Sequence, residues 1–251
     1  MLAVASATDR GRVRSQNEDS LIVDARLGYA ALADGMGGYN AGEVASRIAV
    51  STVDAEMRNL GCEGLDAMTD ERLAAAVSAA VAAANTAICS AAQEHAACAG
   101  MGTTIVMAVW RGASLVTAHA GDSRLYRYRD AVLEQLTRDH SYVQEQVDLG
   151  LLTREQARRS PGRSLVTRAL GMGAQVEIEA GIHRSRPGDL YLLCSDGLSD
   201  MLDDAAMTCA LDEGAQDLDR MAQALVRHAN ENGGRDNISV ILVKVLAQDR
   251  T

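Results

Sequence analysis

The stretch YAALADGMGG, Tyr29 to Gly38, carries an apolar run into one carboxylate, Asp34, and continues at once into glycines. Aspartate is common in turns because its side chain bonds nearby backbone groups, so a single such site would indicate only a strand that ends in a turn. The pattern recurs, with acidic residues beside apolar runs in NEDSLIV (17–23), TAHAGDS (117–123), YLLCSDG (191–197) and GGRDNISVILV (233–243). This recurrence favours a shared task for the carboxylates over separate turns.

Composition limits the classes of partner. The chain has 251 residues, is 47% hydrophobic and has a formal net charge of −10. Nucleic acids and anionic membranes bind basic surfaces, so we expect neither as a main partner. The five cysteines include no CxxC pair, which argues against a zinc knuckle or a disulfide framework and for a reducing compartment. The N-terminus lacks the features of a signal peptide, and we expect a cytoplasmic protein.

The order of apolar runs predicts an α+β fold in one domain over residues 1–251. Strands occur in consecutive groups, which favours antiparallel sheets with helices packed outside them. The alanine-rich window 73–92 has larger apolar residues at helical spacing and predicts a buried amphipathic helix. We expect strands at about 2–8, 20–34, 102–110, 113–121, 123–129, 131–137, 176–182, 189–195 and 238–246. We expect helices at about 41–60, 71–97, 203–212 and 217–231, with a short helical excursion at 140–160 and a loop at 161–175.

The recurring carboxylates predict a metal site. Acidic groups brought together in a half-buried cleft repel one another, and they either take up protons or bind a cation. A set of oxygen ligands without histidine at ligand spacing selects Mg²⁺, Mn²⁺ or Ca²⁺, and the spacing is not that of an EF-hand loop. The glycines after Asp34 and Asp196 allow close approach of the backbone, and Gly35 could offer its carbonyl. The residues alone therefore indicate a metal-dependent hydrolase of phosphate esters.

Eight motifs together resemble one family. They are TDRGRVRSQNEDS, ADGMGGYNAGEVAS, GMGTTIV, AGDSRLYRYR, LTRDHSYVQEQVDLG, TRALG, CSDGLSDML and RDNISVI, and they run in order from Thr8 to Val243. In this order and spacing they resemble the metal-dependent protein phosphatases of type 2C in their stand-alone bacterial form. The resemblance implies a four-layer αββα sandwich of two antiparallel β-sheets flanked by helix pairs. It also implies a small mobile flap at about 141–165.

The resemblance assigns a role to each acidic residue. Asp34 would bridge two ions, Mn²⁺ or Mg²⁺, and Gly35 would contribute its carbonyl. Glu18 would bind one ion, whereas Asp196 and Asp236 would bind the other. The remaining roles concern water and a third, weaker ion: Asp19 would hold metal-bound water, Asp122 would bind the third ion together with Asp196, and Asp200 would approach that ion.

The implied reaction is hydrolysis of phosphoserine and phosphothreonine in proteins by a metal-activated water. Arg14 would clamp the substrate phosphate, a bidentate task that lysine performs poorly. The resemblance implies phosphoprotein substrates and a cognate Ser/Thr kinase whose signalling the enzyme reverses, and we expect a monomer. Two alternatives stay open: a catalytically dead member that acts as a binding module, and a regulatory subunit that mainly scaffolds a kinase or a secretion complex.

The sequence departs from the family pattern at two positions. Met36 stands where many eukaryotic relatives have a histidine that is a candidate general acid, and Tyr39 stands where bacterial relatives often have histidine. The donor of the leaving-group proton is therefore open. We expect His140 to be structural or a flap contact, and His119 to be a packed core residue.

Overall fold

The computed structural model describes residues 1–37, 41–213 and 217–247. Its strands form two antiparallel sheets. The first sheet has the order β1 (Leu2–Asp9), β11 (Ile238–Val245), β10 (Leu190–Cys194), β7 (Arg124–Arg129) and β8 (Val132–Gln135). The second has the order β2 (Asp19–Asp24), β3 (Tyr29–Met36), β5 (Ile105–Arg111), β6 (Ser114–Ala120) and β9 (Glu179–Arg184), with the short β4 (Gly102–Thr103) paired to β3.

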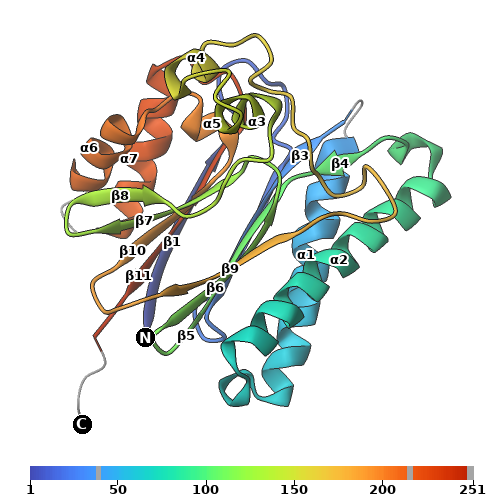
Figure 1. Cartoon of the computed structure of the whole chain (residues 1–251), viewed down its shortest axis with the longest axis vertical. Coiled ribbons are helices and arrows are strands. Elements are labelled where there is room, and N and C mark those ends of the chain that lie inside the picture. Colours follow the sequence, from blue (N-terminus) through green and yellow to red (C-terminus); the bar gives the residue numbers. More distant parts are fainter. Residues whose placement is uncertain (38–40, 214–216, 248–251) are drawn as a thin grey trace.

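Helices cover the outer face of each sheet. On the second sheet, α1 (Ala41–Glu63) packs against β2 and β3, and α2 (Asp70–Glu94) packs against β6 and β9. On the first sheet, α6 (Asp204–Glu213) packs beside α7 (Leu218–Glu231), which lies on β1 and β11. Figure 1 shows the two helix pairs on opposite sides of the strands. The expected four-layer αββα sandwich is confirmed.

The run YAALA in β3 is apolar throughout because both faces of the strand are buried. Ala30 and Leu32 belong to the core between the two sheets, together with Leu193 and Ile241. The alternate residues of β3, Ala31 and Ala33, belong to the core beneath α1 and α2. Successive strand residues point to opposite faces of a sheet, so a strand in the middle of a four-layer sandwich has no polar face. This burial fixes the position of Asp34 at the end of the run.

Helix α2 is long and apolar enough, by length and composition alone, to cross a membrane. The core helix of a soluble protein passes the same test. Here Leu73, Val77, Val81 and Ile88 are fully buried in the core that α2 shares with the second sheet. The prediction of a buried amphipathic helix is confirmed.

Two predicted elements differ from the structure, and two observed elements were not predicted. The expected strand at 20–34 is a hairpin, because Asp24 accepts hydrogen bonds from the backbone N–H groups of Arg26 and Leu27, and Gly28 turns with a φ of 76°. The strand expected at 176–182 begins later, at Glu179, because pairing with β6 starts at His119 opposite that residue. The short helix α5 (Asp196–Ser199) and the two-residue β4 were not predicted.

Candidate metal centre

Two of the predicted acidic residues face each other at one end of the second sheet. Asp19 opens β2 and pairs in register with Asp34 near the end of β3. The backbone of Asp34 is held by two threonines: its N–H donates to Thr104 Oγ1 at 3.1 Å, and its carbonyl accepts from Thr103 Oγ1 at 2.8 Å. The end of β3 therefore has a fixed position, and with it the carboxylate of Asp34.

The other sheet contributes carboxylates to the same end of the sandwich. Asp196 follows β10 at the start of α5, and Asp236 lies just before β11. Asp122 lies in the short connection by which the chain leaves β6 of one sheet and enters β7 of the other. The strand ends of both sheets thus bring together residues that are far apart in sequence.

The electrostatic effect of this convergence is large. Burial raises the pKa of Asp34 well above its ordinary value, and the charges of Asp19, Asp196, Asp122 and Asp236 raise it further. Burial, followed by the charges of Asp122, Asp236, Asp200 and Asp19, likewise raises the pKa of Asp196. Burial is also the main cause that raises the pKa of Asp19 to about 6 and that of Asp122 to about 7. Without a cation, ionising all of these carboxylates near neutral pH has a high cost in free energy.

The donor set fits a hard divalent cation. Asp19 Oδ1 and Asp196 Oδ1 are buried and have no hydrogen-bond partner among the described residues, although buried oxygens normally have one. The backbone of Gly35 is closely approached, since a Cβ there would lie 2.2 Å from Gly42 O and 2.6 Å from Glu18 O. Only glycine leaves room for Glu18 and the first turn of α1 beside the Asp34–Gly35 peptide. Carboxylate oxygens without hydrogen-bond partners are hard ligands, which suit Mg²⁺ or Mn²⁺.

Arg14 contacts this acidic cluster from the loop between β1 and β2. Its Nη2 donates to Asp236 Oδ2 at 2.6 Å, and its side chain is 53% exposed. Its pKa is raised, chiefly by this hydrogen bond, with added contributions from the charges of Asp236, Asp196 and Asp34. Burial raises the pKa of Glu18, which Arg14 partly offsets. The structure therefore brings Arg14 and Glu18 to the carboxylates contributed by both sheets.

A cleft extends away from Asp122 and Asp196. It has a volume of about 870 Å³, and residues of α3 (Tyr142–Asp148) and α4 (Arg154–Arg158) form one wall. The segment between Ser141 and Val166 forms this wall and is closed at its base by a β-bridge between those two residues. These bounds agree with the predicted flap, and the predicted mobility stays a prediction.

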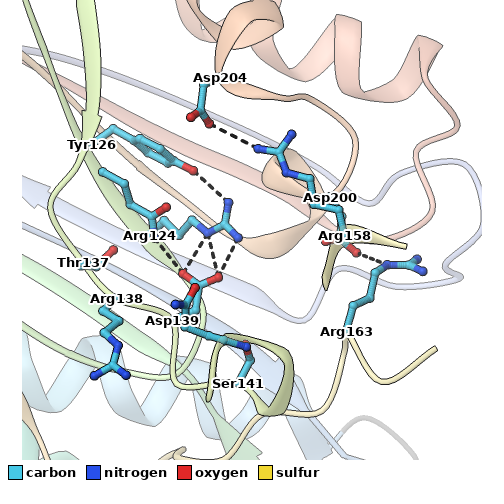
Figure 2. A network of polar contacts seen from close by, with 12 residues as sticks. Arg124, Tyr126, Thr137, Arg138, Asp139, Ser141, Arg158, Arg163, Asp200 and Asp204 are labelled. Atoms are coloured by element: carbon cyan, nitrogen blue, oxygen red, sulfur yellow. Dashed lines mark hydrogen bonds and ion pairs between the residues drawn. The ribbon is translucent and has the colours of Figure 1, made fainter. Parts of the chain in front are cut away.

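Asp200 lies at the border between the flap and the acidic cluster. Its Oδ2 accepts from Arg163 Nε at 3.1 Å, so the residue is paired to the flap side of the cleft. A second, longer ion pair joins Arg158 to Asp204 at 3.7 Å (Figure 2). The charge of Asp200 also contributes to the raised pKa of Asp122 and Asp196. Asp200 thus lies near Asp122 and Asp196, the two residues predicted to bind a third ion, and is paired with Arg163.

Sequence reasoning missed a half-buried ion pair beside Asp122. Arg124 Nε and Nη2 donate to the two carboxylate oxygens of Asp139 at 2.9 and 2.6 Å, and Arg124 Nη1 donates to Tyr126 Oη at 2.9 Å (Figure 2). The pair joins the AGDSR turn to the TRDH segment that leads into the flap. Arg124 lies in the motif AGDSRLYRYR and Asp139 in LTRDHSYVQEQVDLG, but nothing in their spacing indicated that the two side chains would meet.

The two histidines of this region pack together. The rings of His119 and His140 are stacked, with centroids 4.6 Å apart and an interplanar angle of 4°. His140 Nδ1 accepts from Gly121 N–H at 3.2 Å, and its Nε2 lies 3.2 Å from Glu179 Oε2. One ligand atom each from His119, His140 and Glu179 could approach a common ion. Imidazole binds metals in its ring plane, however, and two parallel stacked rings share no such plane. The expected packing role for both histidines fits this arrangement.

Met36 ends β3 and has no hydrogen-bonding proton to give, as expected from the sequence. Tyr39, the other departure from the family pattern, lies outside the described residues. Met36 is therefore not the general acid that protonates the leaving group.

Comparison with known proteins agrees with this fold. The family model described as protein phosphatase 2C matches residues 10–243. The serine/threonine protein phosphatase PstP of Mycobacterium tuberculosis is 41% identical over 249 residues, which are 99% of this chain and 46% of that protein. The serine/threonine phosphatase stp of Listeria innocua is 36% identical over 240 residues, with 94% of this chain and 93% of that protein covered.

A solved structure is similar over nearly the whole chain. The catalytic domain of PstP in complex with two manganese ions has a TM-score of 0.86 and 39% identity, and the alignment covers 98% of this chain and 99% of that one. The chain belongs to the protein phosphatase 2C family. It spans about half the length of the M. tuberculosis PstP sequence that it matches.

Proposed function

We propose that the chain hydrolyses phosphoserine and phosphothreonine in proteins with the help of divalent cations. The observation that carries this proposal is the convergence of Asp34, Asp19, Asp196, Asp236 and Asp122 at one end of the sandwich, with buried oxygens lacking partners. Membership of the protein phosphatase 2C family supports it. We further propose one phosphatase domain, cytoplasmic and monomeric, that reverses a cognate Ser/Thr kinase in signalling.

Asp34 would help to hold both of two Mn²⁺ or Mg²⁺ ions, and Gly35 would contribute its backbone carbonyl. Glu18 would serve one ion and Asp196 with Asp236 the other. Bound cations of this kind supply an acidified water and neutralise charge on the phosphate. Asp122 would bind a third, weaker ion, and Asp200 would approach that ion. Asp19 would hold metal-bound water.

The protein's own residues explain why the reaction should depend on cations. A phosphate dianion that approaches this site meets several carboxylates, and like charges repel strongly in a half-buried site. The carboxylates must therefore be neutralised before a phosphate can bind. Arg14, which is exposed beside Asp236, can then bind two phosphate oxygens with its planar guanidinium and hold the phosphorus in line for attack.

The test is release of inorganic phosphate from a phosphothreonine peptide. We expect no turnover in excess chelator, recovery with Mn²⁺ or Mg²⁺, and no turnover for Asp34→Asn, which removes the bridging charge but keeps the shape. Asp219→Asn, which changes an exposed carboxylate in the first turn of α7, is the matched control and should retain activity. Full turnover in excess chelator, or an active Asp34→Asn, would refute the proposal.

A further inference from the structure

The loop at residues 10–18 must hold two functional groups in place without regular secondary structure. It joins β1 to β2 and carries Arg14 and Glu18, and its residues 12–16 are exposed. A loop with few buried apolar contacts moves easily unless hydrogen bonds fix it. An arginine that clamps a phosphate needs a fixed position, because a shift of about 1 Å can cost roughly 10²-fold in rate.

One buried side chain binds both ends of this loop. The amide nitrogen Nδ2 of Asn237 donates to Arg10 O at 3.0 Å and to Gln16 O at 2.8 Å. Its Oδ1 accepts from the backbone N–H of Glu18 at 2.8 Å. Asn237 is only 5% exposed. Both donor hydrogens of the amide and its acceptor are therefore committed to the backbone of the loop.

The position of Asn237 connects the loop to the acidic cluster. Asn237 directly follows Asp236, whose Oδ1 accepts from the Asn237 N–H at 2.9 Å and whose Oδ2 accepts from Arg14. It also lies beneath α5, since a Cβ on Gly197 would meet Asn237 O at 2.0 Å. A short, rigid amide thus joins the loop to the strand end that carries Asp236.

Other contacts of the loop hold one point each. Arg12 N–H donates to Gly234 O at 2.7 Å, and Asn17 Nδ2 donates to Thr8 Oγ1 at 2.7 Å. Neither contact reaches both ends of the loop. The carbonyl of Glu18 also accepts from Ser46 Oγ at 2.6 Å and from Gly35 N–H at 3.2 Å, which hold the second end alone. Among the side chains of the described residues, Asn237 is the one whose hydrogen bonds join both ends of the loop.

We propose that Asn237 is a positioning residue that holds the 10–18 loop so that Arg14 can bind the substrate phosphate. The kinetic part of this proposal rests on the proposed phosphatase function. The structural part does not, because the position of the loop can be measured without any substrate.

The first experiment measures the loop directly by limited trypsin digestion. Arg10, Arg12 and Arg14 give three cleavage sites within the loop. In Asn237→Ser, whose hydroxyl is too short to reach both ends, we expect cleavage after these arginines to be at least tenfold faster, relative to cleavage elsewhere in the chain. Asn237→Asp keeps the shape and the acceptor for Glu18 but loses the donors, and it serves if the serine variant does not fold.

The matched control is Asn85→Ser. Asn85 is also buried, at 2% exposed, and its side chain also holds a loop, through Gly171 N–H at 2.8 Å and Gly173 O at 3.0 Å. This variant should not accelerate cleavage after Arg10, Arg12 and Arg14. Equal acceleration in both variants, or none with Asn237→Ser or Asn237→Asp, would overturn the proposal.

The second experiment is a double-mutant cycle in kcat/KM on a phosphothreonine peptide. Asn237→Ser should lower kcat/KM by roughly 10- to 100-fold when Arg14 is present. In the Arg14→Ala background the same change should cost less than about threefold, because there is no guanidinium left to misplace. The same loss in both backgrounds would show that Asn237 does not act through Arg14. If the unaltered chain hydrolyses nothing, the proposed function fails, whereas the trypsin experiment still decides the structural part.

Discussion

Replacing Asp122 with asparagine should stabilise the metal-free protein, and more so at higher pH. Asp122 is 8% exposed, and burial followed by the charge of Asp139 raises its pKa from 3.8 to about 7. The folded state therefore binds a proton that the unfolded chain releases above pH 3.8. Stability from this group is complete below that pH and is lost as the pH rises towards 7.

The magnitude follows from the size of this shift. One pKa unit corresponds to about 1.4 kcal/mol, so between pH 5 and pH 8 the folded protein loses roughly 3 kcal/mol through Asp122. Asparagine has the same shape and no charge at either pH. The difference in free energy of unfolding between Asp122→Asn and the unaltered chain should therefore grow by roughly 3 kcal/mol between pH 5 and pH 8.

Urea unfolding followed by circular dichroism, in excess chelator at both pH values, measures this difference. Asp219→Asn, an exposed carboxylate on α7, should show a difference close to zero at both. A difference for Asp122→Asn that is the same at pH 5 and pH 8 would refute the reasoning. It would mean that Asp122 does not carry the charge cost that its surroundings indicate.

Three further outcomes are expected. Arg14→Ala should lower kcat/KM on phosphopeptides by roughly 10- to 100-fold, because charge-assisted hydrogen bonds are lost, while the Mn²⁺ affinity measured by calorimetry stays unchanged. Arg14→Lys should recover only part of the lost kcat/KM. Unchanged kinetics for Arg14→Ala would remove Arg14 from the site. Asp122→Asn should lower kcat on a phosphoserine peptide by roughly 10²–10⁴-fold. The loss of kcat on p-nitrophenyl phosphate should be much smaller, because its leaving group needs no proton. Equal losses of kcat on the two substrates would exclude a role of Asp122 in proton delivery. Asp139→Asn should lower the free energy of unfolding by roughly 1.5–3 kcal/mol, because it removes the charged partner of the half-buried guanidinium of Arg124. A loss below about 0.5 kcal/mol in calorimetry would contradict this.

The sequence allowed prediction of those features that are written into local patterns. Asp34 and Asp196 each follow a run of apolar residues, and the ends of such runs are strand ends. Once two antiparallel sheets were expected, the carboxylates at the strand ends could be expected to lie close together. The alanine-rich α2 was likewise readable from spacing, since its large apolar residues recur on one face.

Contacts between distant side chains could not be predicted in this way. The amide of Asn237 bonds residues more than two hundred positions away, and the pairing of Asp200 with Arg163 depends on where the flap lies over the cleft. The turn between β2 and β3 was missed for a related reason. Asp24 and Gly28 are residue types common in turns, but they stand within a long, mostly apolar run that predicts one strand. The hydrogen bonds of Asp24 to the following backbone show that the chain reverses there.

The pairing of β1 with β11 determines where additional chain would leave the molecule. Leu2 pairs with Val245 at one end of this ladder, and Asp9 pairs with Ile238, next to Asp236, at the other. The N-terminus lies at the foot of the sandwich in Figure 1. Strands rise about 3.4 Å per residue, so Leu2 and Val245 lie roughly 25 Å along the ladder from the end that carries Asp236. Chain attached beyond this pair would therefore leave β1 and β11 at the end of the ladder that is opposite to the acidic cluster.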